Sequence, residues 1–240
     1  MAINAKKWIK TKEVQDLLKK PITEIVTKEF FRDPLRRIYY DPTVMYAPAD
    51  GVVLYAYQCL GPKDPVVEVK GVNFTTQQLI NDKNYNGNSL VVGIFMTVAD
   101  VHVNRMPTNG YFVEENDTPF LFTHNISMYA LEQGFFKDLN YNPDNLSYLF
   151  KNERKVCCVC SNETKGDYYL VQVADKDINT IVNWGDDNYL MQGERFGQIR
   201  WGSQVDLVIP LEDSKVEYEI LIKVHDHVKA GIDPIIRIIK

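Results

Sequence analysis

The sequence contains few cysteines and no long hydrophobic run. Four cysteines occur among 240 residues, and three of them stand together as Cys157, Cys158 and Cys160. Cysteines this close along one strand rarely pair, so we expect reduced thiols and no disulfide framework. No stretch approaches the roughly 18 apolar residues needed to cross a bilayer, and no apolar signal core follows the N-terminus. These absences predict a cytoplasmic protein.

An excess of positive charge is also missing. The chain has 27 Lys and Arg against 32 Asp and Glu, a net charge of -5, and its basic residues form no long block. We therefore predict no nucleic-acid partner. The motifs GxGxxG, GxxxxGK[ST], HExxH and GxSxG are absent too, so most common cofactor-binding and hydrolytic enzymes lose support. A hydrophobic fraction of 45% excludes disorder of the whole chain.

Short runs of β-branched and aromatic residues, separated by Gly, Pro, Asn and Asp, fill the chain from Met45 onward. This pattern predicts strands, at residues 51–57, 66–69, 90–96, 110–113, 119–122, 156–160, 168–173, 205–209 and 216–224. Before them, apolar spacing over residues 8–28 predicts two short helices separated at Pro21. We predict an α+β fold, with a mostly β single domain at residues 30–240 and an N-terminal helical extension at residues 1–29.

The N-terminal extension has two interpretations. Its helices either pack on their own domain or form an amphipathic surface that docks on a membrane or a partner. Lys6, Lys7, Lys10 and Lys12 surround Trp8, so membrane access would be peripheral and would use these basic residues together with Trp8.

Three distinctive segments lie far apart in the sequence: PADG at residues 48–51, DVHVNRMP at 100–107 and GERFGQIRWGS at 193–203. Together and in this order, they resemble the phosphatidylserine decarboxylase family, specifically its short form. Further family blocks are FFRDP at 30–34, VKG at 69–71, IFM at 94–96, NER at 152–154, VQVA at 171–174 and VKAG at 228–231. The resemblance runs from about Phe30 to the C-terminus and implies the mostly β fold of that family.

The resemblance implies a precursor that cleaves itself between Gly202 and Ser203. The Ser203 hydroxyl attacks the Gly202 carbonyl, and elimination and hydrolysis leave a pyruvoyl cofactor at position 203. A glycine before the serine allows strained backbone geometry and close approach of the hydroxyl. The pyruvoyl ketone condenses with a substrate amine as a Schiff base and accepts the electrons released with carbon dioxide. Pyridoxal phosphate has this role in other decarboxylases, so we expect neither pyridoxal phosphate nor a metal.

The resemblance also implies the roles of Asp50, His102 and Arg105. Serine needs a base held by a third group, and in many relatives the third group aligns with Asp50 and the base with Arg105. Arginine stays protonated and cannot be that base. His102 aligns with a histidine that, in the longer relatives, is associated with protonating the decarboxylated intermediate. The base for self-cleavage is left open, and Arg105 either binds a substrate carboxylate or phosphate or pairs with an acidic neighbour such as Asp100.

His225 and His227 are spaced to share one face of a strand, as a pair of metal ligands would be. No obvious third ligand stands nearby, so we predict no metal site.

The chain departs from the family after residues 171–174, where relatives usually continue with glycine and a basic pair. Here Asp175 to Asn179 reads DKDIN, so positive charge expected near a phospholipid headgroup is missing. We expect a carboxy-lyase that converts phosphatidylserine to phosphatidylethanolamine. The alternatives are a pyruvoyl-dependent decarboxylase of a soluble amino acid or peptide and a noncatalytic β-rich scaffold. The sequence leaves open whether the chain forms a homo-oligomer.

Overall fold

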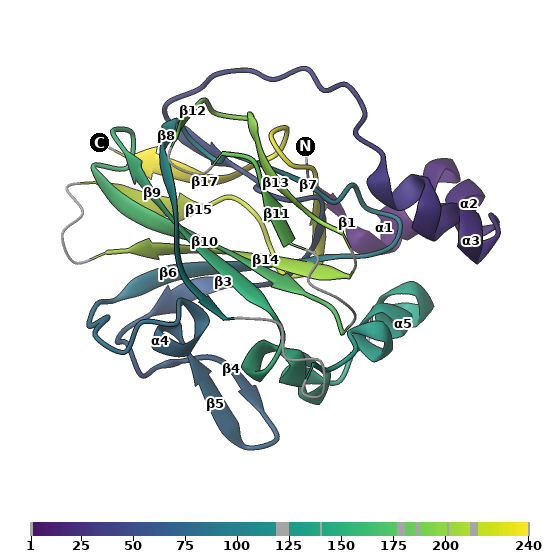
Figure 1. Ribbon diagram of the computed structural model, residues 1–240, viewed down its shortest axis with the longest axis horizontal. Coiled ribbons are helices and arrows are strands. Elements are labelled where there is room, and N and C mark those ends of the chain that lie inside the picture. Colours follow the sequence, from purple (N-terminus) through teal and green to yellow (C-terminus); the bar gives the residue numbers. More distant parts are fainter. Residues whose placement is uncertain are drawn as a thin grey trace.

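The computed structural model describes residues 2–118, 125–139, 141–176, 181–185, 188–200, 202–211 and 216–239, without the side chains of residues 114–118 and 138. At its centre lies a nine-stranded antiparallel sheet (Figure 1). In spatial order its strands are β1 (Ile3–Asn4), β16 (Asp226–Val228), β3 (Gly51–Cys59), β6 (Ser89–Met96), β14 (Ser203–Pro210), β10 (Gly166–Ala174), β9 (Arg154–Ser161), β8 (Gly110–Thr118) and β12 (Asn188–Leu190).

Different layers cover the two faces of this sheet (Figure 1). One face packs against two three-stranded sheets, β11 (Ile181–Asn183), β13 (Arg195–Ile199) and β7 (Val103–Arg105), and β15 (Glu217–Ile220), β17 (Pro234–Ile239) and β2 (Val44–Tyr46). The other face packs against α4 (Thr76–Leu79), α5 (Tyr129–Asp138), the 3-10 helix η2 (Pro143–Phe150) and the hairpin of β4 (Pro65–Val69) and β5 (Val72–Thr75). Because successive side chains of a strand point to opposite faces, β14 contributes to both cores.

The N-terminal extension contains α1 (Ala5–Ile9), α2 (Lys12–Leu18), α3 (Ile22–Thr27) and the 3-10 turn η1 (Glu29–Phe31). The predicted break at Pro21 is present, but a second break at Thr11 makes three helices where two were expected, because Thr11 caps α2. Trp8 and Val14 are buried in the helix-covered core. The helices therefore pack on their own domain, as one interpretation predicted, and Trp8, only 5% exposed, does not form a surface anchor.

The predicted fold class is confirmed, since the chain is mostly β with a few short helices. Strands were expected in the segments that form β3, β6, β9, β10 and β14. The prediction over 216–224 is too long, because β15 ends at Ile220, and the strand expected at 119–122 lies outside the described residues. Pattern reading missed the helix α5 and the strand β17, which lies between β15 and β2.

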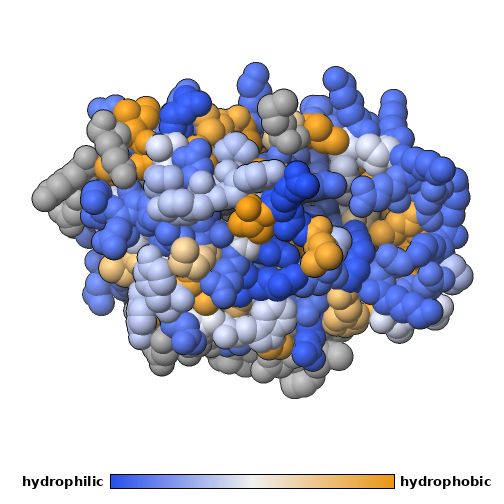
Figure 2. Space-filling model, turned by 90° about the horizontal axis from the view of Figure 1, so that it is seen from above, coloured by the Kyte–Doolittle hydropathy of each residue, from blue (hydrophilic) through white to orange (hydrophobic). Residues whose placement is uncertain are grey.

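The surface carries mainly hydrophilic side chains on the face seen in Figure 2, where hydrophobic ones occur as small separate patches. Scattered hydrophobic residues are normal on a globular surface. Among the helices in the described part of the chain, none combines the length and apolar character that spanning a bilayer requires.

Candidate active site

Ser203 is the first residue of β14 and is fully buried. It pairs with Met96 of β6 on one side and with Ala174 of β10 on the other. Its side chain lies toward the layer containing β7 and β13, because Val205, two residues along, belongs to that core. The hydroxyl Oγ lies 2.8 Å from Nδ1 of His102 and 3.3 Å from the sulfur of Met96.

Gly202 precedes this serine with a φ of +44°, a left-handed conformation that side chains disfavour. A Cβ at this position would lie 2.3 Å from the Cβ of Asp175, which is closer than atoms can approach. Both the backbone angle and the contact with Asp175 therefore require glycine here. The preceding Trp201 of the motif lies outside the described residues.

His102 lies directly before β7 and presents one ring nitrogen to Ser203 and the other to the backbone. Its Nε2 is 3.1 Å from the carbonyl oxygen of Thr97. A carbonyl only accepts hydrogen bonds, so Nε2 carries the hydrogen, and Nδ1 accepts the Ser203 hydroxyl. Burial lowers the pKa of His102 to about 4, although Asp100 and Thr97 partly oppose the change. The imidazole is therefore neutral at pH 7, in the tautomer that accepts the serine proton.

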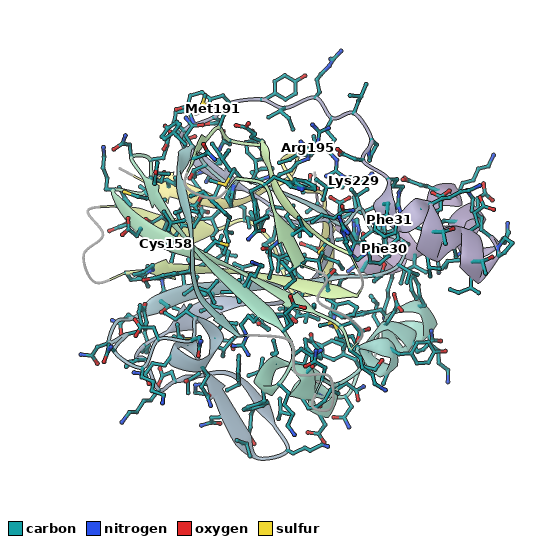
Figure 3. All side chains as sticks on the ribbon, viewed as in Figure 1. Phe30, Phe31, Cys158, Met191, Arg195 and Lys229 are labelled. Atoms are coloured by element: carbon teal, nitrogen blue, oxygen red, sulfur yellow. The ribbon has the colours of Figure 1, made fainter. Side chains whose placement is uncertain are left out.

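The ring of His102 is also held from the side. Phe30 stacks against it with ring centroids 3.7 Å apart and an angle of 22° between the planes. Phe30 lies where the N-terminal helices meet the sheet layers (Figure 3). The FFRDP segment thus contributes a packing wall to the site.

Asp50 forms its hydrogen bonds with Arg36 and Ala230, and none of them is to His102. Its two carboxylate oxygens accept hydrogen bonds of 2.6 and 2.7 Å from Arg36, and Oδ1 also accepts the backbone N–H of Ala230. The group that contacts Nε2 of His102 is the Thr97 carbonyl. The structure therefore shows Asp50 as half of a buried ion pair, and nothing in the sequence pattern identifies Arg36 as its partner.

Arg105 is buried and donates to the carbonyl of Gly193 (2.9 Å) and to Oδ1 of Asp33 (3.1 Å). Its acidic partner is thus Asp33 and not Asp100. The neighbouring residue Asn104 lies 3.7 Å from the sulfur of Met96, on the Ser203 side of β7. Alternation along β7 directs Arg105 to the opposite side of that strand.

Asp100 forms a buried pair with His227, with Oδ1 2.6 Å from Nε2. Sequence reasoning considered both residues in other roles and missed this pair, although Asp100 begins one segment that resembles the family and His227 directly precedes another. His225 precedes β16, has a φ of +69° and contacts the ring of Tyr141, so the prediction that His225 and His227 share a strand face is wrong. Within the described residues, no group of three His, Cys, Asp or Glu side chains could hold a metal.

A pocket of about 250 Å³ opens beside Gly202 and Met96. Its wall includes Glu132 and Asp175 among mainly apolar side chains, and no Lys or Arg stands among the described residues that line it. Burial raises the pKa of Glu132 to about 7. The described part of the pocket wall therefore offers no positive side chain to a phosphate. Residues 177–179 of the departing segment lie outside the described residues.

Comparison with known proteins identifies the family. The family model described as phosphatidylserine decarboxylase matches residues 24–235. The phosphatidylserine decarboxylase proenzyme of Pelagibacter ubique is 32% identical over 84% of this chain and 75% of its own length. The proenzyme of Desulfotalea psychrophila is 31% identical over 85% and 76%, and that of Chlorobium phaeobacteroides is 30% identical over 78% and 69%. The chain belongs to the phosphatidylserine decarboxylase family of carboxy-lyases, as its motifs predict.

Proposed function

We propose that the chain is the precursor of a pyruvoyl-dependent phosphatidylserine decarboxylase that cleaves itself between Gly202 and Ser203. The observation that carries this proposal is the 2.8 Å contact between Oγ of Ser203 and Nδ1 of a neutral His102, next to a glycine with positive φ. Cleavage would separate residues 1–202 from residues 203–240, a small chain of 38 residues.

His102 acts as the base in the first step. Its Nδ1 takes the hydroxyl proton while Oγ of Ser203 bonds to the carbonyl carbon of Gly202, and the proton passes to the leaving amide nitrogen as the C–N bond breaks. The resulting ester carries Gly202 as its acyl group. Loss of the Cα proton of residue 203 then breaks the Cβ–O bond, which releases the Gly202 carboxylate and leaves dehydroalanine. Hydrolysis releases ammonia and gives the pyruvoyl group.

His102 and Met96, which contact the Ser203 side chain, would surround the pyruvoyl group after cleavage. That group supplies the electron sink for decarboxylation. The full burial of residue 203 in the uncleaved chain fits this role, because it excludes bulk water. Arg105 is proposed as a substrate anion ligand only through a rearrangement that frees it from Asp33 and Gly193.

Phosphatidylserine is the proposed substrate because the matched relatives are named for it. A soluble amine without a phosphate is the second candidate, and the two carboxyl groups in the pocket beside Gly202, with no Lys or Arg among its described lining residues, favour it because they would repel a phosphate. Membrane contact, if the substrate is lipid, would use the exposed Lys6, Lys7, Lys10 and Lys12.

The test compares phosphatidylserine vesicles with free serine and short peptides, and measures released carbon dioxide and the amine product. We expect activity on vesicles, declining at high salt, and borohydride added during turnover should attach the substrate to the 38-residue chain. The control is Ser203→Ala, which should show neither activity nor labelling. Activity confined to soluble amines would rule out phosphatidylserine and support a soluble substrate. Label on residues 1–202 would contradict the pyruvoyl chemistry.

A further inference from the structure

A line of hydrogen bonds continues beyond His102, away from Ser203. The Thr97 carbonyl that accepts Nε2–H of His102 belongs to a turn closed by Asp100, whose backbone N–H donates to the same carbonyl at 2.9 Å. Oδ2 of Asp100 accepts the backbone N–H and the hydroxyl of Thr97, each at 2.8 Å. The side chain of Asp100 therefore fixes the residue whose carbonyl orients the imidazole.

The other oxygen of Asp100 is held by His227. Nε2 of His227 lies 2.6 Å from Oδ1, and both side chains are almost completely buried. Trp8 stacks on the His227 ring with centroids 3.9 Å apart and an interplanar angle of 12°. In β16, His227 pairs with Ile3 on one side and Val52 on the other, so its backbone is fixed as well.

The charge of Asp100 depends on this partner. Burial alone would raise the pKa of Asp100, but His227 and the hydrogen bonds from Thr97 bring it below its ordinary value. The carboxylate can then accept both hydrogen bonds from Thr97. A proton on Oδ2 would make that oxygen a donor facing the Thr97 backbone N–H, which cannot accept it, so the ionised carboxylate suits this arrangement.

We propose that His227 is a positioning residue for self-cleavage, acting through Asp100 and Thr97 to keep Nδ1 of His102 facing the Ser203 hydroxyl. This inference rests on the proposed function. His227 follows the cleavage point, whereas Asp100 and His102 precede it. A residue of the future small chain therefore helps to orient the base, which belongs to the future large chain.

The first test measures the cleavage rate of full-length chains made by pulse-labelled translation in vitro. His227→Phe keeps a ring for Trp8 to stack on but cannot donate to Asp100, and we expect cleavage about tenfold slower or more, since a small displacement of a base costs this much. Asp100→Asn should be slowed similarly. His227→Gln retains an N–H donor and should recover to within about threefold of wild type. The matched control is His225→Asn, which suits the left-handed backbone and should cleave at the wild-type rate.

The second measurement separates positioning from general damage to the fold. Nitrogen-15 NMR of the uncleavable Ser203→Ala chain should show His102 as the Nε2–H tautomer, and His227→Phe in that background should give a mixture of both tautomers. Thermal unfolding identifies variants that fail to fold. A folded His227→Phe chain that cleaves at the wild-type rate overturns the inference, and if that variant does not fold, wild-type cleavage by Asp100→Asn overturns it. Failure of the wild-type chain to cleave would instead contradict the proposed function.

Discussion

The two faces of β14 carry contrasting polar clusters. On one face, Ser203 meets His102. On the other, the Gln204 amide donates to the Tyr55 hydroxyl (2.8 Å) and to Asp206 (2.7 Å), and Tyr55 donates to the same carboxyl group. Both clusters are fully buried.

Burial acts in opposite directions on these two clusters. It lowers the pKa of His102 to about 4, which keeps this group a neutral base at pH 7, and it raises the pKa of Asp206 to about 7, so that this carboxyl group keeps its proton in mildly acidic solution. Only the first has a nucleophile and a glycine-linked carbonyl next to it. Burial alone therefore does not make a reactive site, and the partners of the buried group decide its chemistry.

Removal of the base on the Ser203 face of β14 should have the largest effect on self-cleavage. His102→Ala is expected to slow self-cleavage by about 100-fold or more, the contribution typical of general base catalysis. The measurement is the yield of the 38-residue chain over time by gel and mass spectrometry, with His225→Asn as the control. Normal cleavage followed by loss of decarboxylation would restrict His102 to turnover, and normal behaviour in both would remove it from the site.

A side chain at position 202 should also slow self-cleavage. Gly202→Ala places a Cβ within 2.3 Å of Asp175 and disfavours the φ of +44°, so the scissile carbonyl must move. We expect cleavage at least about tenfold slower, since misplacing reacting atoms by 1 Å costs up to 100-fold. Gly61→Ala is the matched control, because a Cβ there meets nothing within 4 Å. Equal rates in the two variants would show that the geometry at Gly202 is unimportant.

Asp50→Asn is expected to act mainly through stability. It breaks a buried ion pair with Arg36, which typically costs about 3–5 kcal/mol. Cleavage should slow less than in Asp100→Asn, and Arg36→Gln added to Asp50→Asn should restore part of the stability. Urea unfolding of chains carrying Ser203→Ala measures the first effect, and cleavage rates measure the second. If a folded Asp50→Asn chain cleaves more slowly than Asp100→Asn, Asp50 has a direct role in self-cleavage and this prediction is wrong.

The cluster of Gln204, Tyr55 and Asp206 is expected to affect only the pH dependence of stability. Because the pKa of Asp206 is raised from 3.8 to about 7, its contribution is fully present below about pH 4 and is lost as the pH rises through 7. Asp206→Asn lacks this titration. As the pH rises from 4 to 8, the free energy of unfolding of wild type should therefore fall relative to that of Asp206→Asn by on the order of 4 kcal/mol. Glu68→Gln, at an exposed position, is the control. A constant difference across this range would contradict the protonated state of Asp206.

The sequence predicted the long central strands β3, β6, β9, β10 and β14 and indicated Ser203, Gly202 and His102 as site residues, because alternation and the family motifs are local signals. It could not predict which groups meet. Asp50 was expected near the base but pairs with Arg36, and the orienting contact comes from a backbone carbonyl, which no residue type encodes. The Asp100–His227 pair joins positions 127 residues apart, so only the fold brings it together.

The most direct test of the account is the intact mass of the purified wild-type protein. The account predicts two chains, residues 1–202 and a 38-residue chain from position 203, whose mass corresponds to a pyruvoyl group and whose N-terminus resists Edman degradation. Ser203→Ala, purified in parallel, should remain one chain of 240 residues. An unmodified wild-type chain of full length after prolonged incubation, or cleavage at another bond, would contradict the account.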